Sequence, residues 1–245
     1  MDINSIQDLL AKLEELHDNH SNDIWYRGQA STDWALTPYF LRLEGRQSES
    51  TLLKRFKQSA AMLIDTAPKQ SFDWLFLMQH YGVPTRLLDW SESPLVALYF
   101  AVENIDDHGD KDGALWLLYP SEFNKNARIH NRDEDGYIPS FEDEELVSYS
   151  IESLKSNPSL QLYPVATIAT RNNARIQAQH GVFTIHHQDQ TAIEDIGDKS
   201  HAVKLNIPRD AKPVLKKQLE LLGYSKFQLF PELSSIGDII KESIQ

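Results

Sequence analysis

The chain has 245 residues, a length at which one hydrophobic core can still support a single domain. It contains no cysteine, which excludes disulfides, thiolate nucleophiles and thiolate zinc sites. Its 36 acidic residues outnumber its 24 lysines and arginines, and no dense basic cluster is present, so duplex nucleic acid is not an expected partner. No apolar segment approaches the roughly 20 residues that span a bilayer. We therefore expect a cytoplasmic protein without a membrane partner.

The first half of the chain is mostly helical by pattern, with one strand. Apolar residues at helical spacing predict helices over residues 1–20, 49–65, 71–81 and 93–104. Ser71 and Ser93 are the expected N-caps of the last two, and Pro94 takes the first helical position. The predicted strand ends in the segment DIWYRGQA, residues 23–30.

The second half alternates between strands and helices. Patterning predicts strands over residues 113–119, 164–169, 174–186, 201–207 and 226–230. It predicts helices over residues 210–223, where Gly223 ends the helix, and 231–245. Residues 128–157 are rich in Asp and Glu and are expected to form an acidic insertion on the surface. Because regular βαβ repeats are lacking, the sequence predicts one α+β domain over residues 1–245, with a mixed sheet and flanking helices.

Arg27 stands directly after the apolar residues of the first strand. A guanidinium keeps its charge in a protein, so beside buried apolar residues it needs an anion. That anion is either a carboxylate of this chain, such as Asp89, or a bound ligand. Gly28 follows and is expected to leave room for a ligand to approach the backbone.

The segment QHYGVPTRLLDWSESPLVALYFA, residues 79–101, holds the densest group of polar side chains. Ser91 and Ser93 precede a buried helix whose free N–H groups favour an anion, although the same hydroxyls also suit helix capping. Asp89 suits either a ligand or a structural pair with an arginine. His80, at the end of the preceding helix, is either a core histidine or faces a cleft.

Common catalytic and metal-binding motifs are missing from this sequence. There is no P-loop, no dinucleotide-binding glycine motif, no nucleophile elbow and no H-E-x-x-H. His186 and His187 are adjacent, but neighbouring residues of a strand point to opposite faces, so we interpret both as surface histidines. No metal is expected.

Four segments in order give the chain a family resemblance: WYRGQA, the segment 79–101, RIQAQHGVFTIH and LFPEL. Together they resemble the FRG domain family, named for its [FY]-R-G motif. Ser91 stands where that family commonly has threonine, and Glu232 where it commonly has aspartate.

The motif order is also similar to that of ADP-ribosyltransferases, and this more distant resemblance implies NAD as cofactor. It implies cofactor contacts by Arg27, Gly28, Ser91 and Ser93, and we add Tyr26, His80 and Asp89 from the same segments as candidate cofactor-binding residues. It implies catalytic roles for Arg27 and Ser91, and for a late glutamate that stabilises an oxocarbenium-like centre. Gln179, in the segment AQHGVF, stands where the corresponding strand of those transferases would begin and so takes the expected place of that glutamate, and Glu232 is the other candidate.

Three functions remain open from the sequence. The first is an NAD-using, ADP-ribosyltransferase-like enzyme acting as a toxin or defence effector on a protein or nucleic-acid target. The second is a non-catalytic module that binds a nucleotide or another small anion, which the lack of a glutamate at residue 179 favours. The third is a protein-interaction domain in which Arg27 pairs with Asp89 in the core. In the first two a nucleotide-type small molecule is the partner.

Overall fold

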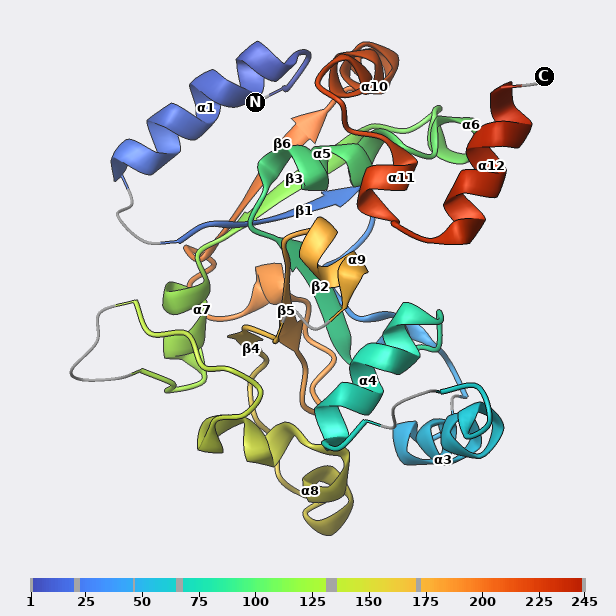
Figure 1. Ribbon diagram of the computed structural model, residues 1–245. Helices are drawn as coiled ribbons and strands as arrows, with labels where there is room; N and C mark the ends of the chain where they lie inside the picture. The colour runs from blue at the N-terminus through green and yellow to red at the C-terminus, as the bar shows by residue number, and fades with distance from the viewer. Residues whose placement is uncertain are drawn as a thin grey trace.

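The computed structural model in Figure 1 describes residues 2–19, 23–45, 47–64, 68–130, 136–170 and 173–243. A single six-stranded sheet, in the order β4-β5-β2-β1-β3-β6, forms the centre of this part of the chain. Its strands are β1 (Trp25–Gln29), β2 (Leu87–Ser91), β3 (Gly113–Leu118), β4 (Val165–Thr167), β5 (Gly181–Ile185) and β6 (Ala202–Ile207). Helices flank the sheet, which confirms the predicted α+β class.

Every strand pair in this sheet is antiparallel, so the predicted mixed sheet is wrong. Helix α5 connects β2 to β3, and these two strands do run in the same direction. However, β1 is inserted between them and pairs with both. The two strands that run in the same direction are therefore separated by an antiparallel strand.

The helices lie on both sides of the sheet and around its ends (Figure 1). The α-helices are α1 (Ile6–Asn19), α2 (Tyr39–Arg42), α3 (Glu49–Ala60), α4 (Ser71–His80), α5 (Pro94–Val102), α6 (Ile105–His108), α7 (Pro120–Asn126), α8 (Ile151–Ser156), α9 (Ala174–Ala178), α10 (Lys212–Leu221), α11 (Lys226–Leu229) and α12 (Leu233–Ser243). The 3-10 helices are η1 (Glu144–Tyr149), η2 (Ile193–Asp195) and η3 (Arg209–Ala211). No helix among the described residues is long and apolar enough to cross a membrane.

Three apolar clusters hold these layers together. On one face, α1, α5 and α10 pack over β1, β3 and β6. On the other face, Trp25, Trp90 and Trp116 centre a second cluster. A third cluster joins α4 to β2 and β5, with Phe183 and Leu75 among its members. Because α5 is apolar nearly all round, it can be buried between the sheet and α10.

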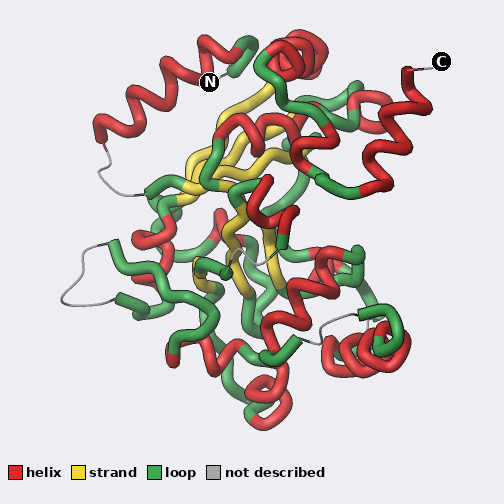
Figure 2. The backbone as a smooth tube through the Cα atoms, in the orientation of Figure 1, coloured by secondary structure: helices red, strands yellow, loops and turns green. Residues whose placement is uncertain are grey.

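The sheet divides between its two central strands. β1 forms five residue pairs with β3, and β2 forms five with β5, but β1 and β2 pair only at Tyr26 and Ser91. Beyond that pair the two strands part, and Figure 2 shows the strands in two groups that run in different directions. β1 thus lies beside residues 87–91, and Arg27 lies at the gap between the two strands.

Two predicted strands are at least partly helical. Residues 174–178 form α9, capped by the Asn173 side chain, and β5 begins only at Gly181. Residues 226–229 form α11, where Ser225 and Gln228 make a capping box. In both segments alternating apolar residues imitate a strand, and the local capping groups favour a helix instead.

Other predictions need smaller corrections. Gln70, not Ser71, is the N-cap of α4. Of the acidic insertion, residues 131–135 lie outside the described part, and Glu142, Glu144 and Glu145 are exposed. The same insertion also buries apolar side chains, Phe141, Leu146 and Tyr149, in the third cluster.

The interpretation of His186 and His187 as surface histidines is wrong, because both are fully buried. His186 follows β5 directly and bonds to the Thr191 carbonyl, with 3.2 Å between Nε2 and O. His187 lies edge-on to the Tyr149 ring. Burial lowers the pKa of each imidazole to about 4, so both are neutral at pH 7.

Candidate functional site

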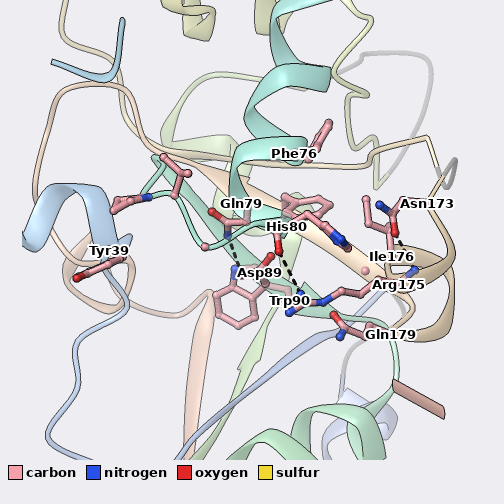
Figure 3. A pocket seen from close by; sticks show the side chains of 15 residues that line it. Tyr39, Phe76, Gln79, His80, Asp89, Trp90, Asn173, Arg175, Ile176 and Gln179 are labelled. Atoms are coloured by element: carbon pink, nitrogen blue, oxygen red, sulfur yellow. Dashed lines mark hydrogen bonds between the residues drawn. The ribbon is translucent and has the colours of Figure 1, made fainter. Parts of the chain in front are cut away.

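Two adjoining pockets open where β1 and β2 part. The first, which we call the Arg27 pocket, has a volume of about 270 Å³ and lies between residues 26–30, in and just after β1, and the end of α5. The second, the His80 pocket, has a volume of about 240 Å³ and lies between α4 and α9 (Figure 3). They share four lining residues, Asp89, Trp90, Arg175 and Gln179. Each is somewhat smaller than the roughly 300–1,000 Å³ usual for ligand sites, and together they fall within that range.

Arg27 spans the gap between the strands. Its Nη1 donates a hydrogen bond to the main-chain carbonyl of Asp89, with 2.6 Å between N and O. Its Nε is buried and has no hydrogen-bond partner among the described residues. Burial lowers the pKa of this guanidinium, Asp89 opposes that shift and Arg42 adds to it. The group still carries its charge at neutral pH, so a buried cationic donor beside the pocket is left without an acceptor among the described residues.

The Asp89 carboxylate has a different partner. Oδ2 accepts a hydrogen bond from Nε2 of Gln79, with 2.8 Å between the atoms, and Oε1 of Gln79 accepts one from the Thr85 hydroxyl. The Asp89 side chain is exposed and borders both pockets. Arg27 and Asp89 therefore do not form the buried ion pair that was one of the two predicted alternatives. Arg27 contacts the main chain of Asp89 instead.

Arg86, the residue before β2, forms a buried pair with Glu49. Its Nε lies 2.6 Å from Oε2 of Glu49, and its two Nη atoms donate to the carbonyls of His186 and Tyr149. All three guanidinium nitrogens thus have acceptors within the protein. The two arginines differ in this respect, because Arg86 is fully paired and Arg27 is not.

Gly28 lines the Arg27 pocket, but its missing side chain serves helix packing. A Cβ at this position would lie 1.8 Å from the carbonyl oxygen of Ala97 in α5. The space expected for a ligand on that face is thus filled by backbone. Tyr26 also faces α5; its hydroxyl lies 3.3 Å from Nε2 of His17, and burial raises its pKa to about 12, with Tyr119 contributing.

Ser91 and Ser93 have structural bonds. The Ser91 hydroxyl donates to the carbonyl of Gln179 at 2.7 Å and accepts the N–H of Ser93 at 3.0 Å. The Ser93 hydroxyl accepts the N–H of Val96, so Ser93 is the N-cap of α5 as predicted. Ser91 also lines the Arg27 pocket. Ser93 is thus a helix cap, and the hydrogen bond of Ser91 connects β2 to the end of α9.

The late motifs reach the same region through α9 and the turn before α12. Gln179 ends α9 instead of beginning a strand, and its Nε2 donates to the Leu229 carbonyl at 3.0 Å. Oε1 of Glu232 lies 3.6 Å from Nε2 of His80, whose pKa is lowered by burial although Glu232 opposes that shift. Glu232 thus reaches the His80 pocket through His80, not as a lining residue.

Arg175 and Glu103 line the Arg27 pocket and were not among the predicted site residues. Arg175 stacks on the Phe230 ring, with its guanidinium carbon 4.6 Å from the ring centroid, and Nη1 approaches the His80 carbonyl at 3.5 Å. Glu103 is the C-cap of α5. The sequence did contain a sign of Glu103, because an acidic residue there directly follows nine residues of an apolar helix.

The described residues contain no group of three or more His, Asp or Glu side chains that could hold a metal ion. The polar groups of the site are instead guanidinium, carboxyl and amide groups, which suit an organic anion with hydrogen-bonding groups.

Comparison with known proteins identifies one family. The FRG domain family matches residues 22–110. No curated protein and no solved structure matches the chain. The matched region contains Arg27, His80, Asp89 and Ser93, whereas Arg175 lies beyond it. An FRG domain is therefore present at residues 22–110, and these residues supply Arg27 and both strands that border the gap of the candidate site.

Proposed function

We propose that this chain binds a nucleotide-type anion in the two adjoining pockets, with NAD as the expected ligand. The observation that carries the proposal is the Arg27 guanidinium, which is charged, lines the pocket and has a buried Nε without a protein partner. A buried charged donor without a partner is costly, and a phosphate would satisfy it through charge-assisted hydrogen bonds. The contrast with the fully paired Arg86 supports a ligand role for Arg27 over a structural one.

The paired pockets favour a ligand with more than one part. Arg175 lines both pockets, and both are bordered by aromatic side chains such as Trp90. A dinucleotide offers phosphates for the arginines and planar rings for the aromatic walls. NAD is named because the motif order resembles that of ADP-ribosyltransferases.

A thermal-shift screen tests the proposal directly. The protein is melted with NAD, ADP-ribose, ATP and AMP, each from micromolar to millimolar concentration. A ligand at about a hundred times its Kd should add ~2.7 kcal/mol of stability. Titration calorimetry then gives the affinity of each compound that shifts the melt. No shift and no heat with any of the four compounds would contradict nucleotide binding.

A second candidate function is an ADP-ribosyltransferase-like reaction on bound NAD, in a toxin or defence effector. It is favoured by the carboxylates near the His80 pocket, since Asp89 borders it and Glu232 approaches it through His80. Carboxylates there would stabilise a cationic sugar centre. Purified protein with NAD should then release nicotinamide, and Glu232→Gln or Asp89→Asn should reduce the release without lowering the melting temperature. Tight NAD binding without release would leave the binding module as the function.

A further inference from the structure

Glu103 places a free carboxyl group in the same pocket as Arg27. The residue ends α5, and its side chain is only partly exposed. Its main-chain carbonyl accepts a bond from Nζ of Lys216, with 3.4 Å between the atoms. Among the described residues the carboxyl group itself has no hydrogen bond and no ion pair, and Arg27, although it lines the same pocket, is not its partner.

Local stability gives no reason for an acid at this position. A carboxylate at a helix C-terminus is repelled by the helix dipole. Burial raises the pKa of Glu103 to about 7, and the lysines and Arg175 nearby offset that shift only in part. An acid that is held in a cleft against its own stability is typical of a functional site.

We infer that Glu103 is a ligand-binding residue, which accepts hydrogen bonds from the sugar hydroxyls of a ribose phosphate whose phosphate contacts Arg27. The inference rests on the nucleotide binding proposed above and assigns the ribose side of that ligand. It also predicts selectivity, because a second phosphate in place of a sugar hydroxyl would be repelled by the carboxylate.

The chemistry of the pocket supports this assignment over a cationic ligand. A carboxylate has only acceptors, which suit vicinal hydroxyls, and a guanidinium has only donors, which suit a phosphate. Both groups remain available because they do not pair with each other. A ligand cation would meet Arg27 and Arg175 in the same small pocket, where like charges disfavour it.

The test compares two probes on three variants by titration calorimetry at pH 8. ADP-ribose carries both phosphates and sugar hydroxyls, whereas pyrophosphate carries phosphates alone. Glu103→Gln keeps the shape of the side chain and removes its charge, so ADP-ribose should bind about tenfold more weakly or worse. Pyrophosphate should bind equally well or more tightly, since a repelling carboxylate is gone. Glu144→Gln, an exposed position outside both pockets, removes the same charge and should change neither affinity.

The outcomes separate this inference from the function on which it rests. If Glu103→Gln loses affinity equally for ADP-ribose and pyrophosphate, or binds ADP-ribose like the parent, the proposed role of Glu103 is overturned. Arg27→Lys should weaken both probes, and if it binds both like the parent, the proposed function fails whatever Glu103→Gln does. A parent protein that binds neither probe overturns both proposals. Melting curves of each variant show that the fold is intact.

Discussion

The two arginines of the domain show how one residue type serves two purposes. Arg86 is buried with Glu49 and donates to two further carbonyls, so its charge is satisfied by the protein. Arg27 donates to one carbonyl and keeps Nε without a partner. Sequence reasoning identified Arg27 as needing an anion, but it could not decide between Asp89 and a ligand. Which of the two Arg27 meets depends on the direction that its side chain takes across the gap between β1 and β2.

Removing one partner of the buried pair should strongly destabilise the fold. Arg86→Met leaves the Glu49 carboxylate buried and unpaired, which should cost roughly 3–5 kcal/mol of unfolding free energy. Urea denaturation measures this loss. The double variant Arg86→Met with Glu49→Met should recover part of it, because no charge is then left alone. A single variant as stable as the parent would contradict the structural role of Arg86.

Glu103→Gln should stabilise the free protein in a pH-dependent way. The pKa of Glu103 is raised to about 7 from an ordinary value of 4.5, so its neutral form is favoured in the folded state. In the parent the unfolding free energy should therefore fall as pH rises from about 4.5 to 7 through this group. The glutamine variant lacks that loss and should be more stable at pH 8 by ~1–3 kcal/mol, with little difference near pH 4. Urea denaturation at both pH values checks this.

At the scale of elements, the sequence predicted best where local capping and packing agree. Ser93 and Pro94 correctly placed the start of α5, and its apolar composition correctly indicated burial. The segments that form α9 and α11 were wrongly predicted as strands, because a short run with alternating apolar residues fits the period of a helix as well as that of a strand. The sequence near β1 and β2 gives no sign that they pair at one residue position only, because strand pairing depends on residues far apart in the chain.

The close contact between β1 and α5 makes a glycine necessary at residue 28. Gly28→Ala places a Cβ against the backbone of Ala97, which cannot move without shifting α5. We expect a loss of about 3 kcal/mol or more in unfolding free energy. Gly237→Ala in α12 is the matched control, since a Cβ there meets no atom within 4 Å, and it should stabilise by up to about 1 kcal/mol. If the two variants unfold alike, the helix does not approach the strand this closely.

At the scale of the molecule, the candidate site combines segments from most of the chain. Arg27, Asp89, Glu103 and Arg175 line one pocket although nearly 150 positions separate the first from the last. The family motifs indicated which segments matter, but composition and periodicity could not show that the end of α5 joins them. That arrangement follows from the sheet order, which places β1 between β2 and β3.

Buried histidines should make the whole fold sensitive to acid. The pKa values of His80, His186, His187 and His201 are all lowered, chiefly by burial. The unfolded chain therefore binds more protons, and stability should be lost as pH falls from about 6.5 towards 4. Each fully buried histidine contributes up to ~1.4 kcal/mol per pH unit within that window, and Glu103 opposes the trend. Urea denaturation at pH 7, 6 and 5 tests this, and equal stability at all three would contradict it.

The most direct test of the account is nucleotide binding by Arg27→Lys. Lysine keeps the charge but loses the planar guanidinium, so a phosphate held by that group should bind at least about tenfold more weakly. The melting temperature should stay close to that of the parent, because Arg27 makes one hydrogen bond with the described part of the protein. NAD titrations and melting curves of parent and variant give both quantities. Equal NAD affinity in the two proteins would contradict the account, as would a large loss of stability without a change in binding.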